Sequence, residues 1–306
     1  MFFCQKIDYS EKKLYFVLIM KTVSLALSGG AARGYAHIGV IRELINSGFK
    51  INAIAGTSMG AVVGAMFAAN KLDGYEKWVK NLYQYDIINL LGFSIKGGLI
   101  KTDKLFSVLG EMIGQDTLIE DLPIKFCAVC VDIISKREVW FQEGNLLFAI
   151  KASSAIPSIF YPVEANGHLY VDGGILNNLP VGALKNSQSD YVIAVDVSSN
   201  VKAEYDINIT QDEEERQNSL FAQFQKISKK FRKNSQNRYS MFDVAAISLD
   251  IMQNALKSYK LAENKVDILI EIPQSACKMY DFHKAHQLIE IGKIATKKAL
   301  DYYQQK

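Results

Sequence analysis

Apolar and polar positions form blocks along the first part of the chain, and these blocks predict two consecutive strand–helix units. The apolar runs at 22–27 and 51–55 have the length of buried strands, and each is followed by a turn that contains glycine. Helices are expected after the turns, over 35–47 and up to residue 70. Because consecutive units of this kind form parallel strands, both turns are expected at the same edge of one sheet.

The rest of the chain mixes helical and strand patterns, which predicts an α/β fold with a mainly parallel central sheet. Residues 73–120 are expected to be mainly helical, with a loop near 95–100. Further strands are expected at 123–134 and 138–141, which would form a hairpin, and at 168–172, 191–197 and 266–272. Further helices are expected at 146–155, 242–259 and 282–303.

The sequence shows no internal repeat and no low-complexity linker, and its 306 residues fit one large α/β domain. We expect that domain to span 21–306, after an N-terminal extension of residues 1–20. The apolar stretch 14–20 is too short for a signal peptide or a membrane span, and Met20 is a candidate translation start. The composition shifts at residue 200, so an irregular basic segment is expected at about 200–240.

The second half of that segment is strongly basic. Residues 216–242 carry seven basic side chains and no acidic one, directly after the acidic run 212–215. Phe221, Phe224 and Phe231 recur near helical spacing, which is typical of a basic amphipathic helix and would suit an anionic membrane surface. A solvated helix or a mobile lid fits the same pattern and is the plainer interpretation, so these alternatives stay open.

Composition and cysteine usage narrow the class of protein. Hydrophobic residues make up 49% of the chain, which supports a large core, and the net charge of +3 is too small to indicate a nucleic-acid partner. Cys127 and Cys130 form a C-x-x-C motif inside a predicted strand, where side chains three positions apart point to opposite faces. We interpret both as buried core thiols, expect no metal and no other cofactor, and place the protein in the reducing cytoplasm.

A possible nucleophile lies in the second turn, which reads Gly56-Thr57-Ser58-Met59-Gly60. A G-x-S-x-G motif between a strand and a helix is typical of a nucleophile elbow, a sharp turn that lifts serine out of the sheet. The turn crowds the backbone, which explains the flanking glycines, and it places Ser58 at a helix N-terminus that favours an oxyanion. A tight turn that contains serine by chance is the alternative.

The first turn, at 28–34, has the sequence SGGAARG. It lacks the Gly-Lys-Ser/Thr of a P-loop and the G-x-G-x-x-G of a dinucleotide-binding loop. Backbone N–H groups at a helix start also hold anions that form during a reaction, and Arg33 would support the loop or add positive charge. A plain strand–helix turn is the alternative.

A candidate acid ends the predicted strand at 168–172. There Asp172 is followed by Gly173 and Gly174, which positions the acid to leave the sheet and face a cleft. Taken alone, an Asp-Gly pair is more often an ordinary turn. Asn177 and Asn178, which follow, are expected to cap or fill turns.

A serine nucleophile needs a base, and the chain offers four histidines: His37, His168, His283 and His286. A triad in α/β-hydrolase order would need His283 or His286, which are expected on the surface of the C-terminal helix. His37 is expected to pack within the first helix. His168 lies too far along a regular strand from Asp172 for the two to bond. An aspartate whose pKa is raised by an apolar wall is left as a direct base.

Four blocks in this order resemble the patatin-like phospholipases, nearest to their bacterial cytosolic branch: LALSGGAARGYAHIGVI, AGTSMGAVVGAMFA, ASSAIPSIFYPV and VDGGILNNLP. The resemblance covers about residues 22–198 and implies a three-layer α/β/α fold with a Ser–Asp catalytic dyad. Ser58 matches the family nucleophile. Asp172 matches the aspartate of the Asp-Gly-Ala/Gly motif, which implies that it is the general base.

The resemblance also assigns an oxyanion hole. Gly29, Gly30, Ala31 and Arg33 match the family's oxyanion loop, and Met59 would add a backbone N–H. Many members have glycine where this chain has Ala31; the N–H survives that change, so we expect a tighter pocket and unchanged chemistry. The glycines that support the motifs are Gly34, Gly56, Gly60, Gly173 and Gly174.

What the resemblance implies is a serine lipid acyl hydrolase of phospholipids, lysophospholipids or simpler lipid esters, with a role in lipid degradation. We expect it in the cytoplasm, and contact through 216–242 would bring it to the inner face of the membrane. Two other classes stay open. One is an esterase with a Ser–Asp–His triad, and the other is a non-catalytic member that binds lipid or a partner protein.

Overall fold

A computed structural model describes residues 4–5, 17–18, 20–90, 102–202 and 241–305 of the chain. The strands β1 (Cys4–Gln5) and β2 (Val17–Leu18) form a small antiparallel pair. The loop expected near 95–100 and nearly all of the basic segment 216–242 lie outside the described residues.

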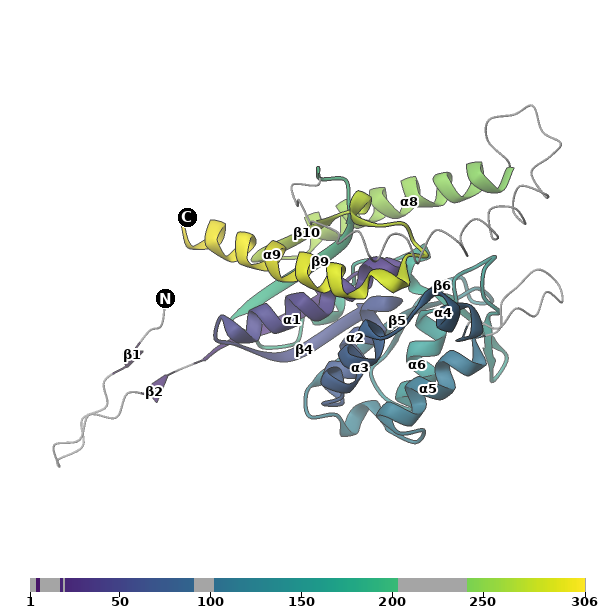
Figure 1. Cartoon of the computed structure of the whole chain (residues 1–306), viewed down its shortest axis with the longest axis horizontal. Helices are drawn as coiled ribbons and strands as arrows, with labels where there is room; N and C mark the ends of the chain where they lie inside the picture. The colour runs from purple at the N-terminus through teal and green to yellow at the C-terminus, as the bar shows by residue number, and fades with distance from the viewer. Residues whose placement is uncertain (1–3, 6–16, 19, 91–101, 203–240, 306) are drawn as a thin grey trace.

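An eight-stranded sheet forms the centre of the domain, with strand order β10-β9-β3-β4-β5-β8-β7 and with β6 paired to the side of β5 (Figure 1). The first five strands of this order are parallel, and β6, β7 and β8 join antiparallel. The strands are β3 (Lys21–Leu27), β4 (Phe49–Thr57), β5 (Lys125–Asp132), β6 (Arg137–Phe141), β7 (Val163–Ala165), β8 (His168–Asp172), β9 (Tyr191–Ser199) and β10 (Ile268–Pro273).

Helices cover the sheet, so the predicted three-layer α/β/α fold with a mainly parallel sheet is confirmed (Figure 1). The described α-helices are α1 (Ala36–Asn46), α2 (Met59–Ala68), α3 (Leu72–Lys80), α4 (Gln84–Leu90), α5 (Asp103–Ile113), α6 (Leu146–Ser153), α8 (Met241–Glu263) and α9 (Ala285–Gln304). Short 3-10 turns connect several elements: η1 (Ala31–Tyr35), η2 (Ile119–Asp121), η3 (Gly173–Ile175), η4 (Val181–Leu184), η5 (Gln274–Ala276) and η6 (Phe282–Lys284).

The two faces of the sheet are buried by clusters of apolar side chains that differ in size. Leu25 and its alternate neighbours on β3 belong to the large core, which also contains buried residues of α1, α2 and α9. Ala26 points to the other face and belongs to a smaller cluster, in which Leu179 and Leu184 pack and Leu261 of α8 makes contact. Because both faces of the sheet are covered, residues 23–27 of β3 and 126–132 of β5 are buried whichever face they point to.

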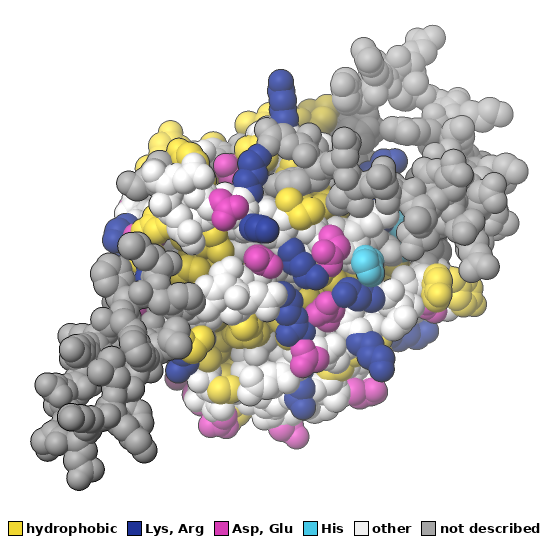
Figure 2. All heavy atoms as spheres, turned by 60° about the vertical axis from the view of Figure 1, so that its left-hand side comes forward, with side chains coloured by type: hydrophobic (Ala, Val, Ile, Leu, Met, Phe, Trp, Pro, Cys, Tyr) yellow, Lys and Arg dark blue, Asp and Glu magenta, His cyan; other side chains and the backbone are white. Residues whose placement is uncertain are grey.

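The predicted elements are present, with shifted ends. The first helix begins at Ala36, one residue later than expected, because η1 occupies the chain before it. The hairpin of β5 and β6 is confirmed. The C-terminal helix begins at Ala285, so His283 lies in η6 and the expectation that it shares a helix with His286 is wrong. Figure 2 shows acidic and basic side chains interspersed on one face, in keeping with the small net charge.

Candidate active site

Ser58 occupies a strained turn between β4 and α2. Its backbone angles, φ 54° and ψ −125°, lie in a region that side chains rarely adopt, and such strain costs roughly 1–3 kcal/mol. The turn has no room for a side chain at Gly56 or Gly60, two residues before and after the serine. A Cβ atom at Gly60 would overlap the Leu27 carbonyl, and one at Gly56 would lie 2.5 Å from the amide nitrogen of Ala61. The predicted elbow geometry is therefore present in the backbone.

Two neighbouring hydroxyl groups hold this turn. The backbone N–H of Ser58 donates to Oγ of Ser153, 2.9 Å away, and that hydroxyl donates to the Val129 carbonyl at 2.6 Å. Oγ1 of Thr57 donates to the carbonyl of Asn177 at 2.8 Å. Ser153 ends α6 and Val129 lies in β5, so the serine turn is bonded to the helix and strand beside it.

The strand register brings Asp172 to the level of Ser58. Thr57 of β4 pairs with Val129 of β5, and Cys130, the next residue of β5, pairs with Asp172 of β8. Ser58 and Asp172 therefore lie at the same level, with one strand between them. Since adjacent strands are about 4.8 Å apart, side chains from both sides can meet over β5.

Asp172 is buried, and this changes its acidity. Both Ser58 and Asp172 are only 6% exposed. Burial raises the pKa of the Asp172 carboxyl to about 6, and hydrogen bonds from the Ser58 side chain and from the N–H of Gly174 (2.7 Å) oppose that rise. The carboxylate thus contacts the Ser58 side chain and is ionised at neutral pH. The residues that follow it, Gly173 and Gly174, begin η3.

The glycine-rich loop lies beside the serine. A Cβ atom built on Gly29 would be 3.1 Å from Cβ of Ser58, so the loop backbone is in contact range of Ser58. The N–H of Gly29 donates to the carbonyl of Asn178 at 3.0 Å, and Nδ2 of Asn178 donates back to the Gly29 carbonyl at 3.5 Å. Asn178 therefore fills a turn, as expected, and it fixes the loop next to Ser58.

The Arg33 side chain points into the protein. Its Nε and its backbone N–H both donate to the carbonyl of Gly30, at 3.4 and 3.2 Å, and Nη1 donates to the carbonyl of Gln274 at 3.1 Å. Burial lowers the pKa of the guanidinium, and the nearby groups of Cys277, Asp250 and Asp196 oppose this. Arg33 was expected either to support the loop or to add positive charge, and these contacts show that it supports the loop.

Two further backbone N–H groups expected in the oxyanion hole, those of Ala31 and Met59, lie at the starts of helical turns. Ala31 begins η1 and Met59 begins α2, and the first N–H groups of a helical turn have no partner within it. Ala31 has φ 49°, a left-handed conformation that favours glycine, which explains why glycine suits this position of the loop. Gly34 lies in η1, where a Cβ atom would overlap the Met59 side chain.

His37 and His168 are bonded to groups other than Ser58 and Asp172. His37 is buried in α1, where its Nε2–H donates to the Ser28 carbonyl at 2.8 Å and burial lowers its pKa to about 4. Nδ1 of His168 lies 2.8 Å from the Asp132 carboxylate. Asp196 lies between Ser58 and His283 in the chain and so has the order of a triad acid, but its carboxylate accepts a hydrogen bond of 2.6 Å from Nζ of Lys257.

The other sequence features do not add a site. Cys127 and Cys130 are free and buried, and burial raises both pKa values to about 12, so the interpretation as core thiols is confirmed. Within the described ranges, no group of three or more acidic, histidine or cysteine side chains is arranged to hold a metal ion. In the same ranges, no helix is long and apolar enough to cross a membrane.

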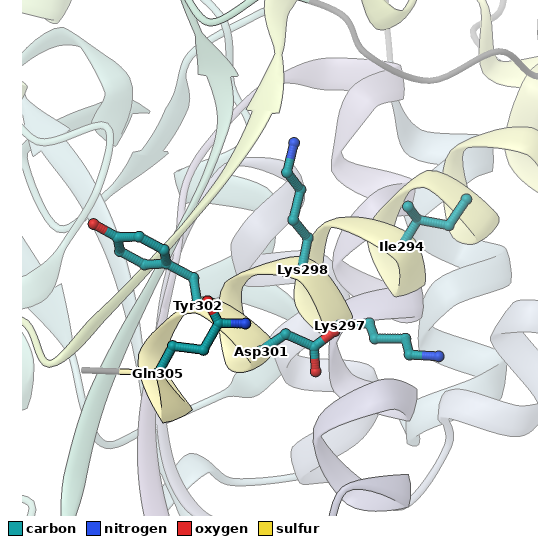
Figure 3. Close-up of a pocket in the computed structure, with 6 residues that line it drawn as sticks. All are labelled: Ile294, Lys297, Lys298, Asp301, Tyr302 and Gln305. Atoms are coloured by element: carbon teal, nitrogen blue, oxygen red, sulfur yellow. The ribbon is translucent and has the colours of Figure 1, made fainter.

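Figure 3 shows a pocket on the outer side of α9, lined by Ile294, Lys297, Lys298, Asp301, Tyr302 and Gln305. The neighbouring Tyr303 ring packs against Tyr191, the first residue of β9. Ser58 and the glycine-rich loop follow the carboxyl ends of the parallel strands. The pocket therefore lies at the opposite edge of the sheet from Ser58, and we do not assign substrate binding to it.

The sequence missed one structural residue of the site. Ser153 was expected only as part of the helix at 146–155, yet its hydroxyl bonds the Ser58 backbone. A serine that interrupts the apolar end of a buried helix was the available clue. Which carbonyl and which N–H it would bond depended on how α6 packs against β5.

Comparison with known proteins gives consistent results. Residues 25–185, just over half of the chain, match the family model described as patatin-like phospholipase. An uncharacterised NTE family protein of Mycobacterium tuberculosis, Rv1063c, is 34% identical over 92% of this chain and 92% of its own length. Human patatin-like phospholipase domain-containing protein 6 is 31% identical over 63% of this chain, which corresponds to 14% of that protein.

One solved structure shares the fold. VipD from Legionella pneumophila superimposes with a TM-score of 0.57 and 14% identity, over 93% of this chain and 67% of VipD. At this level of identity the likeness concerns the arrangement of strands and helices alone.

Proposed function

The chain belongs to the patatin-like phospholipase family, and from that premise we propose that it cleaves acyl ester bonds of lipids through Ser58 and Asp172. Family membership supports lipid acyl hydrolase activity in general. The finer assignment is supported by one observation above all. The register of β4, β5 and β8 puts Ser58 and a buried carboxylate of raised pKa at the same level, and their side chains interact.

In the proposed reaction, Asp172 takes the proton of the Ser58 hydroxyl as Oγ attacks the ester carbonyl carbon. The tetrahedral intermediate collapses, the proton passes to the leaving alcohol, and an acyl-serine ester remains. Asp172 then takes a proton from water, whose oxygen attacks the acyl carbon, and Ser58 recovers its proton as the fatty acid leaves. A pKa near 6 keeps Asp172 ionised at neutral pH while making it a stronger base than an ordinary aspartate.

The proposed oxyanion hole consists of the N–H groups of Gly30, Ala31 and Met59. Gly29 and Arg33 belong to the same loop, but their N–H groups are bonded to the carbonyls of Asn178 and Gly30. We therefore assign Gly29 and Arg33 a supporting role. Each donor of such a hole contributes roughly 10²–10³-fold to the rate.

Arg33 acts on this hole through one peptide group. In a trans peptide the C=O and the following N–H point in opposite directions, so fixing the Gly30 carbonyl also fixes the direction of the Ala31 N–H. The guanidinium Nε–H of Arg33 also brings positive charge next to that carbonyl oxygen. Hydrogen bonds in such a chain polarise one another, which strengthens the Ala31 N–H as a donor.

The substrate class follows from the family, and the setting follows from the sequence. We propose phospholipids, lysophospholipids or simpler lipid esters as substrates, cleaved in the cytoplasm, where the buried free thiols of Cys127, Cys130 and Cys277 stay reduced. Contact of 216–242 with the inner face of the membrane stays an alternative to a lid or a solvated helix.

The test is ester turnover by the purified protein and its Ser58→Ala variant. Wild type should release fatty acid from a lysophospholipid and alcohol from a soluble short-chain ester, and Ser58→Ala should reduce both rates by at least about 10³-fold. Equal rates in the two proteins would refute Ser58 as the nucleophile. A variant His283→Ala or His286→Ala that lost as much activity as Ser58→Ala would support a triad instead.

A further inference from the structure

The helix α8 has its polar and apolar sides reversed. Asp250, Gln253, Lys257 and Lys260 recur at helical spacing and face the protein. The opposite side of the helix is apolar and faces outward, and its members are 48–75% exposed: Val244, Ile247, Ile251, Met252 and Tyr259. A helix on the surface of a water-soluble domain normally shows the reverse arrangement.

The inward side of α8 is bonded to two strands, β9 and β6, one of which contacts a segment next to the candidate site. Nζ of Lys257 donates to Asp196 at 2.6 Å, at the end of β9, and Nζ of Lys260 donates to Glu138 at 2.9 Å. Glu138 in turn accepts a hydrogen bond of 2.5 Å from Nδ2 of Asn177, whose carbonyl holds Thr57.

Gln253 lies even closer to the candidate base. Its Nε2 is 3.3 Å from the place that a Cβ atom would take on Gly174, the residue whose N–H bonds Asp172. The helix therefore covers η3 with its inward side, and its outward side forms the molecular surface above that turn.

The outward side has the chemistry of a contact with lipid. Its positions from Val244 to Tyr259 carry no charge, and contiguous exposed apolar side chains on one element mark an interaction surface. Aliphatic side chains with a tyrosine at one end are typical of helices that lie in the boundary between lipid headgroups and acyl chains. The sequence just before the helix indicates that the lipid is anionic, because 216–240 carries seven basic and no acidic residues.

We infer that the outward side of α8 docks on the surface of an anionic lipid aggregate and so holds Ser58 and Asp172 next to their substrate. This inference rests on the proposed function, which makes a lipid ester the substrate. A lipid surface explains why the polar residues of α8 bond β6, β9 and η5 while its apolar residues face away from the core. Charged lipid headgroups would add the attraction that the preceding basic residues favour.

The experiment measures binding separately from turnover. The Ser58→Ala protein is mixed with vesicles of phosphatidylcholine and phosphatidylglycerol, and the bound fraction is measured by flotation. The test variant adds Ile247→Gln and Ile251→Gln, and the control adds Ile294→Gln on α9. Ile247 and Ile294 are matched, because they are 48% and 47% exposed on different helices.

The double variant should lower the vesicle partition coefficient by roughly tenfold or more, since two aliphatic side chains no longer enter the lipid, and the control should bind as the parent does. If the double variant does not fold by circular dichroism, Ile251→Gln alone should give about half of that effect on a logarithmic scale. Equal binding by test variant and control, or no binding by the parent, would overturn the inference.

A second copy of the chain is the competing occupant. If the parent sediments as a dimer and the double variant as a monomer, without vesicles, the surface is a protein interface and the inference is wrong. Failure of the proposed function has a different signature. Wild type would then leave a soluble short-chain ester intact, whatever the result of flotation.

Discussion

Ser58 and Asp172 lie at the same level of the sheet, but different kinds of structure hold them. Ser58 is held by its own turn, in which a positive φ angle is enclosed by close contacts of Gly56 and Gly60. The conformation of the turn belongs to the five continuous residues 56–60, while Ser153 and Asn177 tie it to neighbouring segments. A change in the turn is therefore expected to act through the backbone.

Asp172 is held by distant parts of the chain. Its backbone N–H donates to the Ala155 carbonyl at 2.9 Å, its strand pairs with β5, and burial sets its pKa. The comparison teaches that the proposed nucleophile depends on a local turn, whereas the proposed base depends on packing between segments about 40 residues apart. The two residues should respond to different substitutions.

The largest effect is expected for Asp172→Asn. The amide keeps the size of the side chain and an acceptor for the Gly174 N–H, but it cannot take the proton of Ser58. We expect kcat to fall by about 10³-fold, within the 10²–10⁴-fold range for a general base, as measured on a soluble ester. A variant within fivefold of wild type would remove Asp172 from the mechanism and return attention to a histidine.

The same variant should gain stability. Because the pKa of Asp172 is raised above its unfolded value, the folded state binds the proton more tightly, and that stability is lost as pH rises from about 4 to about 6. At pH 8 the ionised, buried carboxylate therefore destabilises the folded state, and asparagine carries no such charge. Urea unfolding should show Asp172→Asn more stable by up to about 3 kcal/mol at pH 8, with a smaller gain at pH 4.

On the nucleophile side, Gly60→Ala is expected to be damaging through the backbone. Its Cβ atom would overlap the carbonyl of Leu27 in β3, so the turn or the strand must shift. We expect a loss of about 3 kcal/mol in unfolding free energy together with a large loss of turnover. The control is Gly74→Ala in α3, which has nothing within 4 Å of the new atom and should stabilise by about 0.5–1 kcal/mol. If both substitutions destabilised the protein, overlap of the new Cβ atom with the Leu27 carbonyl would not be the cause of the loss.

A smaller effect is expected for Ser153→Ala, because it leaves the turn intact and removes one of its supports. The buried N–H of Ser58 and carbonyl of Val129 would both lose a partner. We expect a loss of about 2 kcal/mol in unfolding free energy. Ser153→Cys, which keeps a weak donor and acceptor, should recover part of the loss, and a neutral Ser153→Ala would show that the turn needs no such support.

The smallest effect is expected from pH on the wild-type enzyme. A base with a pKa of about 6 is ionised in roughly one molecule of eleven at pH 5, so kcat/KM at pH 5 should be about tenfold below its value at pH 8. The buffered rate on a soluble ester gives this profile. A profile flat down to pH 5 would mean that the base has an ordinary carboxyl pKa and is not in the buried environment of Asp172.

The sequence predicted the parts of the site that depend on continuous residues. The two strand–helix units, the elbow at Ser58 and the glycine-rich turn follow from local patterns, and the parallel connection placed both turns at one edge. Asp172 was different, because an Asp-Gly pair is an ordinary turn in most contexts. Its assignment came from the resemblance to a family, and its level beside Ser58 became visible only through the pairing of β8 with β5.

Features that depend on packing were out of reach of the sequence. Nothing local indicates that the N–H of Gly29 is bonded to Asn178, or that Ser153 holds the Ser58 turn. The short strand β7 was missed because three residues carry too little pattern. The helix at 242–259 was predicted, but its reversed orientation requires knowledge of which side meets the protein.

The most direct test of the account is covalent labelling of the proposed nucleophile. Wild type, Ser58→Ala and Asp172→Asn are treated with a fluorophosphonate probe, and the labelled residue is located by mass spectrometry. The account predicts label on Ser58 in wild type, none in Ser58→Ala, and much slower labelling in Asp172→Asn. Label at another residue, or none in a folded wild-type protein, would contradict the central claim that Ser58 is an activated serine.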